Sequence, residues 1–238
     1  MTPRLLRLLL GIVVLYSFTA HAMHPSWDAD HDGINDCEND GSCDHTVNYN
    51  EPRPFLVEGA VTSPTFDCGT ANLSGAEQVI CEQPKLSWLD QALAQTYGAA
   101  LEKTQDEEKR AQLKAEQRGW IKGRDECWKS PPLAACIEQS YTRRIAELTA
   151  RFALIDPAVI LTLTCHDASQ KPLLARYYST QPATLVLQRD DQAKLLYRQE
   201  GGGDATYAGQ NVGFTQVDKY YQLRWGVAGA AVKCRALD

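Results

Sequence analysis

The stretch YAGQNVGFTQVDKYYQLRWG, residues 207–226, decides the fold of the last part of this 238-residue chain. Apolar and aromatic side chains alternate with polar ones through Val212 and Phe214 and again through Leu223 and Trp225. An alternation with a period of two is typical of a strand that buries one of its faces. The stretch therefore predicts two strands joined by a short turn.

The same period of two continues on both sides of this stretch. After residue 157 it runs through VILTLTC, LLARYYS, TLVLQRD and AKLLYRQ, and the chain ends on AVKC and four further residues. Six to eight short strands in residues 157–238 predict a small antiparallel barrel. A disulfide between Cys165 and Cys234 would join the first and last strands and so protect the edge of the barrel.

Residues 63–152 have the spacing of helices instead. Ser74-x-x-Glu77 is a capping box, and Pro84 is suited to the first turn of a second helix. Apolar residues three and four apart mark one face of four helices, and the third of these faces includes Trp128. The predicted fold class is α+β: a small disulfide-bonded helical bundle followed by a small antiparallel β-barrel, preceded by an acidic segment that resembles a calcium loop.

The N-terminus indicates export. Arg4 and Arg7 precede an apolar run over residues 8–16, and AHA at residues 20–22 is a cleavage pattern of a secretory signal peptide. The alternative, a transmembrane helix, is disfavoured because the run is short. No cysteine follows closely enough to form a lipobox. We therefore expect residues 1–22 to be removed, leaving a periplasmic or secreted protein without a membrane anchor.

The charge of the remaining chain argues against nucleic acid as a partner. Without Arg4 and Arg7 the chain has 22 basic and 30 acidic side chains, a formal charge of about −8. Nucleic-acid-binding domains carry the opposite sign. Seven of the carboxylates lie in residues 23–45, which contain no Lys or Arg.

The acidic segment, residues 23–47, carries the pattern DADHDGIND. Oxygen ligands at every second residue and a Gly that permits a sharp turn are typical of a calcium loop. The pattern resembles the loops of thrombospondin type 3 repeats. The expected ligands of one structural Ca²⁺ are Asp28, Asp30, Asp32, the carbonyl of Ile34, and Asp36. The alternative is a solvated acidic linker. Residues 48–62 contain two of the prolines that mark an extended linker.

Eight cysteines in an exported chain predict disulfides. Each expected pair falls within one segment of uniform composition: Cys37 with Cys43, Cys68 with Cys81, Cys127 with Cys136, and Cys165 with Cys234. A zinc site is disfavoured because the chain has no CxxC motif. The chain also lacks Gly-x-Ser-x-Gly, HExxH and phosphate-loop motifs, so we expect no enzymatic activity.

The helical segment resembles a known family. FDC, VIC, LSWLDQALAQTY and AEQRGWIKGRDEC, followed by a Cys and a Tyr five residues apart, are similar to the LprI-like N-terminal domain over residues 63–152. The resemblance implies lysozyme inhibition. Glu116, Arg118, Lys122 and Arg124 form either a polar ridge beside Trp120 or surface ion pairs around a Trp120 that lies in the core.

The barrel segment resembles the MliC family, inhibitors of c-type lysozyme. Tyr, a Gly-containing turn, Asn-Val, Phe, a Lys-bearing turn and a closing Trp are typical of the late hairpin of that family. The resemblance implies that a loop enters the lysozyme cleft, where a Ser and a Lys meet the catalytic carboxylates. Gly203 and Val217 occupy those two positions here. The residues expected to face lysozyme instead are Asp204, Thr206, Tyr207 and Lys219.

These observations predict a periplasmic lysozyme inhibitor that binds a c-type lysozyme of a host or competitor and blocks its active-site cleft. The alternative is a non-catalytic, calcium-stabilised module that binds the cell envelope.

Overall fold

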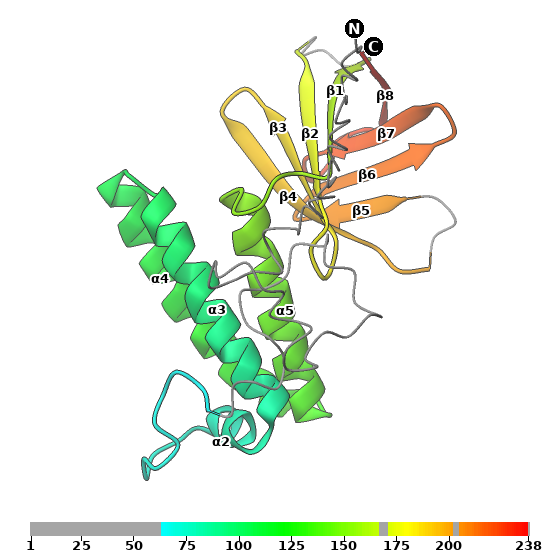
Figure 1. Cartoon of the computed structure of the whole chain (residues 1–238). Coiled ribbons are helices and arrows are strands. Elements are labelled where there is room, and N and C mark those ends of the chain that lie inside the picture. The colour runs from blue at the N-terminus through cyan, green and yellow to red at the C-terminus, as the bar shows by residue number, and fades with distance from the viewer. Residues whose placement is uncertain (1–62, 167–170, 202–204, 238) are drawn as a thin grey trace, which may run out of the picture. The chain divides into compact units, whose positions relative to one another are not determined.

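The computed structural model describes residues 63–166, 171–201 and 205–237. All of them belong to one compact unit. Four α-helices and a 3-10 helix come first, and eight strands follow (Figure 1). This order confirms the predicted α+β class. The predicted calcium ligands and the Cys37–Cys43 pair lie outside the described residues.

The first three helices begin where capping and proline chemistry predict. Ser74 Oγ accepts from the backbone N–H of Glu77, and the Glu77 carboxylate accepts from the N–H of Ser74 at 2.8 Å, so the predicted capping box is confirmed. Pro84 opens the second helix, and the Asp106 side chain caps the third. The bounds are α2 Gly75–Glu82, α3 Pro84–Lys103, α4 Glu107–Asp125, η2 Glu126–Lys129 and α5 Leu133–Arg151.

The helices share one apolar core, and two disulfides fasten its periphery. The largest fully buried side chains in it are Ile80, Leu86, Leu113, Ile137, Tyr141 and Leu148. Cys68 bonds to Cys81 in α2, and Cys127 of η2 bonds to Cys136 in the first turn of α5. None of the helices in the described part of the chain is long and apolar enough to cross a bilayer.

The strands form a closed antiparallel barrel in which each strand pairs with its neighbour in sequence and β8 returns to β1 (Figure 1). Cys165 and Cys234 are register partners on β1 and β8 and are bonded to each other. The bounds are β1 Val159–Cys165, β2 Leu173–Tyr178, β3 Thr184–Arg189, β4 Gln192–Arg198, β5 Thr206–Gly209, β6 Val212–Val217, β7 Tyr220–Trp225 and β8 Val232–Ala236. Three of the four predicted disulfides are thus present.

The predicted hairpin is confirmed as β6 and β7, which pair antiparallel, but the stretch 207–226 also contains β5, a third strand that the alternation did not predict. A first tight turn at Gln210–Asn211 separates β5 from β6, and a second at Asp218–Lys219 separates β6 from β7. Asn211 has a φ of 57° and Asp218 a φ of 49°, and Asn and Asp are the residue types that tolerate this left-handed conformation in turns. Only glycine fits at position 209, the last residue of β5, because a Cβ there would lie 2.2 Å from the carbonyl oxygen of Leu195.

A small apolar cluster joins the end of α5 to the barrel. Ala150 of α5 packs with Tyr178 of β2 and Val186 of β3, and all three are buried.

Candidate functional site

A chain of buried polar groups connects three helices at the centre of the bundle. The hydroxyl of Tyr141 on α5 donates to Asp90 Oδ1 on α3 at 2.8 Å and accepts from Arg124 Nη1 on α4 at 2.7 Å. The other oxygen of Asp90 accepts from the backbone N–H and the hydroxyl of Thr65, at 2.7 and 2.6 Å. Because each of these groups is hydrogen-bonded, the network fixes how the helices meet rather than destabilising them.

The electrostatics of this network keep the phenol neutral. Burial and, next, the neighbouring Asp90 carboxylate raise the pKa of Tyr141 far above its usual range. A neutral hydroxyl can donate to Asp90 and accept from Arg124 at the same time, whereas a phenolate could only accept. The network is therefore a structural support of the bundle.

Arg124 decides between the two interpretations of the AEQRGW segment. Its side chain is only 4 % exposed and lies 5.7 Å from the ring centroids of both Trp120 and Tyr141. Trp120 packs against the helical core with its ring edge-on to Tyr141. Glu116 pairs with Arg151 of α5 at 2.6 Å. The polar ridge that included Arg124 is therefore wrong, because this part of the motif holds the bundle together.

The environment of Trp128 differs from the buried face that the helical periodicity predicts. It was expected on the same face as Trp120 and Arg124, yet α4 ends at Asp125 and Trp128 lies in η2 with 66 % of its surface exposed. A 3-10 turn advances the side chains by a larger angle per residue than an α-helix does. Cys127 takes the buried position next to it and is 4 % exposed. The disulfide thus buries the residue before Trp128 and leaves the indole outside.

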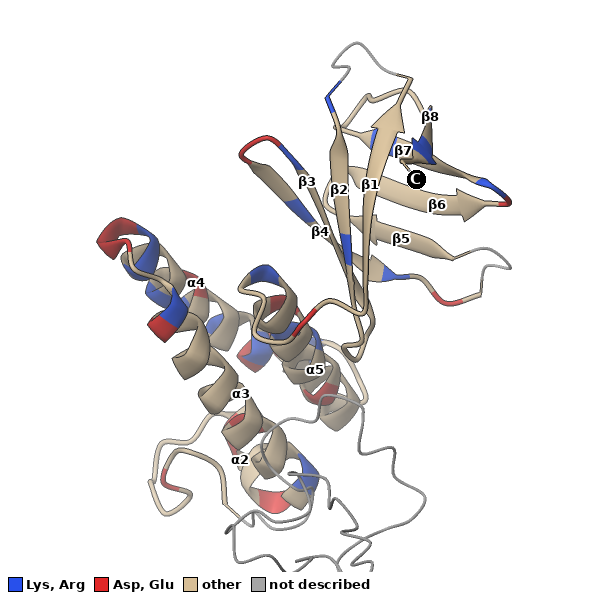
Figure 2. Ribbon diagram, turned by 45° about the horizontal axis from the view of Figure 1, so that its top comes forward, with Lys and Arg blue, Asp and Glu red and all other residues tan. Residues whose placement is uncertain are grey.

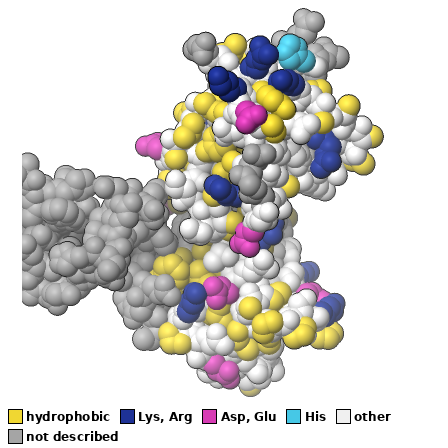
Figure 3. All heavy atoms as spheres, turned by 90° about the vertical axis from the view of Figure 1, so that its right-hand side faces the viewer, with side chains coloured by type: hydrophobic (Ala, Val, Ile, Leu, Met, Phe, Trp, Pro, Cys, Tyr) yellow, Lys and Arg dark blue, Asp and Glu magenta, His cyan; other side chains and the backbone are white. Residues whose placement is uncertain are grey.

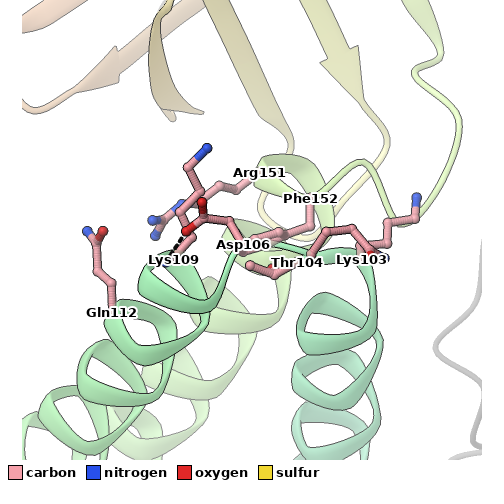
Figure 4. Close-up of a pocket in the computed structure, with 8 residues that line it drawn as sticks. Lys103, Thr104, Asp106, Lys109, Gln112, Arg151 and Phe152 are labelled. Carbon is pink, nitrogen blue, oxygen red and sulfur yellow. Dashed lines mark hydrogen bonds between the residues drawn. The ribbon is translucent and has the colours of Figure 1, made fainter.

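A shallow depression of about 390 Å³ lies where α3 turns into α4 and where α5 ends (Figure 4). Its polar groups serve the helix ends: Asp106 Oδ1 accepts from the N–H of Lys109 at 2.9 Å, and the ammonium of Lys103 donates to the carbonyl of Ala153. Within the described residues no group of three or more His, Cys, Asp or Glu side chains is arranged to hold a metal ion.

The residues predicted to face lysozyme have different environments in the barrel. Tyr207 is 6 % exposed, and its ring packs edge-on against Tyr177 in the interior. Thr206 precedes it on β5, where its hydroxyl bonds to that of Thr215 at 3.3 Å. Lys219 is exposed in the turn between β6 and β7, and Asp204 lies outside the described residues. Figure 2 shows basic and acidic residues at the tip of that hairpin. The structure therefore does not place Tyr207 and Lys219 side by side on the surface.

The barrel wall has a charge pattern that the net charge of the chain conceals. Every charged residue on the eight strands is basic: Arg176, Arg189, Lys194, Arg198, Arg224, Lys233 and Arg235. Figure 3 shows Lys and Arg side chains gathered with a His at one end of the barrel.

Three of these bases are exposed on neighbouring strands β7 and β8, and two of them lie against the sheet. The ammonium of Lys233 is 3.7 Å from the ring centroid of Tyr220. The guanidinium of Arg224 crosses Gly213, where a Cβ would meet its Nη2 at 3.5 Å. We name Arg224, Lys233 and Arg235 the basic face of the barrel. The register places Lys233 opposite Gln222, two residues from Arg224 along β7.

The helical part has a counterpart among known families. Residues 68–148 match the family model "Lysozyme inhibitor LprI". The matched segment contains both disulfides of the helical part, most of the Tyr141 network and the exposed Trp128.

Proteins named LprI resemble more of the chain than this segment. The chain is 28 % identical over 183 residues to "Lipoprotein LprI" of Mycobacterium bovis and to that of Mycobacterium tuberculosis. Each alignment covers 73 % of this chain and 87 % of the relative. No solved structure matches the chain.

The loop that carries Trp128 is the functional candidate that the sequence reading did not single out. Two signals were available: Cys127 precedes Trp128 directly, and two prolines at positions 131 and 132 exclude a continuous helix. Both indicate a constrained loop rather than a buried helical face.

Proposed function

We propose that this protein binds a c-type lysozyme, of a host or of a competitor, and blocks its active-site cleft. The observation that carries the proposal is the LprI match at residues 68–148, on a helical bundle that has its own core and two disulfides. A rigid scaffold of this kind loses little conformational entropy when it binds, which favours tight association.

The protein acts in this proposal as a binding partner and not as an enzyme. Inhibition requires only a preorganised surface that fills a cleft, and the buried side chains of Asp90, Tyr141 and Arg124 are hydrogen-bonded to one another. The barrel contributes a second exposed element, the β6–β7 turn with Lys219, whose ammonium is suited to a site that contains carboxylates.

Lysozyme inhibition requires that the protein be exported, and we propose the periplasm or the exterior of the cell as its location. The N-terminal segment with Arg4, Arg7 and the AHA pattern supports this. The relatives are themselves named lipoproteins. Mass spectrometry of the secreted chain should find a new N-terminus at Met23; retention of residues 1–22 would contradict the leader.

Calcium is proposed as a structural ion of the acidic segment. The DADHDGIND spacing supports Asp28, Asp30, Asp32, the carbonyl of Ile34, and Asp36 as ligands. Calorimetric titration of the exported chain with Ca²⁺ should show one weak site that is lost in Asp30→Ala/Asp32→Ala. Unchanged uptake in that variant would identify the segment as an acidic linker.

The decisive test of the proposed function is a lysis assay. Increasing amounts of the exported chain are added to a purified c-type lysozyme that is clearing a peptidoglycan suspension. The expected result is stoichiometric loss of clearing at micromolar or lower concentrations, with and without a calcium chelator. Undiminished clearing at an excess of the chain would refute inhibition of that lysozyme class.

A second function has one specific observation in its favour. The basic face of the barrel, Arg224, Lys233 and Arg235, is suited to an anionic polymer of the cell envelope. This is the alternative of a calcium-stabilised envelope-binding module. Cosedimentation with purified cell walls should then be strong, should fall with salt, and should be weakened by neutralising these three residues to Gln. Equal cosedimentation of that variant would reject this alternative.

A further inference from the structure

We infer that the loop closed by the Cys127–Cys136 disulfide is the segment that enters the lysozyme cleft, with Trp128 as its anchor and Lys129 beside it. The inference rests on the proposed function and assigns it to particular residues. We name residues 127–136 the disulfide loop. It lies within the segment that matches the LprI model.

The first argument is the exposure of Trp128. Among the described residues it is the one aromatic side chain that ranks with the exposed large hydrophobic residues, at 66 %. Burying an indole is strongly favourable, so an exposed Trp contributes a large binding free energy when a partner covers it. Tryptophan is also the residue type most enriched among side chains that dominate binding energy at protein interfaces.

The second argument is that the loop is rigid before any partner arrives. The disulfide joins η2 to α5 with a Cα–Cα distance of 5.7 Å. Backbone hydrogen bonds from Ser130 N to Cys127 O and from Cys136 N to Pro132 O brace it from within. At its base the buried Arg124 is bonded to Asp125 and to Tyr141. A loop that is already ordered pays little entropy on binding.

The third argument is that residues 128–132 are all exposed while the flanking Cys127 is buried. The tip therefore presents a Trp, a Lys, a Ser and two Pro side chains to solvent on a base that is anchored in the core. Such a short convex element is the shape that fills a concave site, whereas a flat helix face would only cover its rim.

The chemistry of the tip selects the cleft of a glycosidase as the partner. A cleft that binds a polysaccharide chain has surfaces on which sugar rings stack, and it holds two carboxyl groups on either side of the scissile bond. The Trp128 ring is a flat apolar group suited to a sugar subsite. The Lys129 ammonium lies 5.1 Å from the centroid of that ring and is suited to the carboxylates.

The ammonium of Lys129 can exchange its present partner for a carboxylate of the cleft. Its present partner is Glu126 in the same 3-10 turn, and both side chains of that ion pair are more than half exposed. Exposed pairs of this kind contribute little to stability, because water and salt compete with them. A desolvated carboxylate in the cleft therefore competes well for the ammonium.

The test uses the full exported chain and three variants. Trp128→Ala removes the anchor, Lys129→Gln removes the cation, and Val227→Ala is the matched control, because Val227 is 85 % exposed but lies after β7 in the barrel. Inhibition of a purified c-type lysozyme is measured by the lysis assay, and binding by calorimetry. Thermal unfolding verifies that each variant is folded. Because all three positions are exposed, the midpoint of unfolding should stay close to that of the wild type.

The expected result is an inhibition constant at least about 30-fold weaker for Trp128→Ala, equivalent to about 2 kcal/mol at 1.4 kcal/mol per tenfold. Lys129→Gln should weaken it by several-fold and reduce its dependence on salt, and Val227→Ala should leave it unchanged. A short chito-oligosaccharide that occupies the cleft should compete with the wild-type chain.

The outcomes separate this inference from the function on which it rests. If the wild-type chain does not slow the lysozyme, the proposed function fails and the assignment fails with it. If the wild type inhibits and a folded Trp128→Ala inhibits equally well, the disulfide loop is not the docking segment and the function stands. A variant that loses self-association but keeps full inhibition shows that Trp128 contacts a second copy of the chain, which also overturns the assignment.

Discussion

Replacing Tyr141 with Phe should destabilise the protein more than the loss of one oxygen atom suggests. The hydroxyl donates to Asp90 and accepts from Arg124, and Tyr141 and Arg124 are almost completely buried. Without it, a buried carboxylate and a buried guanidinium each lose a hydrogen-bond partner. Water cannot replace these bonds without opening the core.

The magnitude follows from the partners. A hydrogen bond to a charged group contributes about 1.5–3 kcal/mol, and two bonds that share one hydroxyl are not additive. The free energy of unfolding should therefore fall by about 3 kcal/mol. At about 2–4 °C per kcal/mol for a chain of this size, the midpoint of thermal unfolding should fall by roughly 6–12 °C.

Urea unfolding followed by circular dichroism measures this change, with Tyr97→Phe as the matched control. Tyr97 packs against the same core, but its hydroxyl makes no hydrogen bond with the described residues. The control should change stability by less than about 0.5 kcal/mol. A double-mutant cycle with Asp90→Asn should give a coupling energy of about 1–3 kcal/mol. If Tyr141→Phe and Tyr97→Phe are equally stable, the network is not a support of the fold.

Three further predictions concern pH and the barrel disulfide. Burial raises the pKa of Tyr197 to about 12, above an unfolded value of about 10. The contribution of the neutral phenol to stability is therefore present below pH 10 and is lost as the pH rises toward 12. Tyr197→Phe should reduce the fall of the urea midpoint at alkaline pH, and an unchanged dependence of that midpoint on pH would contradict the raised pKa. The hydrogen bond from Arg151 lowers the pKa of Glu116, so this carboxylate stabilises above its unfolded pKa and less as the pH falls below it. Glu116→Gln should therefore cost about 1 kcal/mol at pH 7, since the pair is partly exposed, and almost nothing at pH 2; a cost that is independent of pH would argue for a packing effect. Replacing Cys165 and Cys234 together with Ala should lower the free energy of unfolding by about 4 kcal/mol, because the bond closes a loop with a sequence separation of 69; a loss below 1 kcal/mol would mean that the strand pairing alone closes the barrel.

The sequence was sufficient for the elements that local chemistry dictates. The Ser74 capping box, the helix that opens at Pro84 and the alternation in the strands each depend on residues within a few positions of one another. Export chemistry and spacing were enough to pair Cys165 with Cys234 before the barrel was known. The order of helices and strands followed from these local signals.

The environment of single side chains was predicted less well, and for the same physical reason each time. Helical spacing predicts which residues share a face but not where the helix ends. It therefore placed Trp128 on the buried face of α4, although α4 ends at Asp125. Strand alternation likewise predicted one turn where the chain makes two, because Gln210 and Asn211 leave the apolar pattern almost undisturbed.

The sequence by itself determined the two classes of secondary structure, their order and the pairing of the cysteines in the described residues, since these depend on neighbours along the chain. Only the tertiary structure decided that Arg124 is buried beneath Tyr141, that Tyr207 lies inside the barrel while Lys219 lies outside, and that the indole of Trp128 is exposed. Burial depends on which distant elements cover a residue. Arg124 is buried because it lies against its hydrogen-bond partner Tyr141, which comes from α5. Trp128 is exposed because the disulfide joins the preceding residue, Cys127, and not Trp128, to α5.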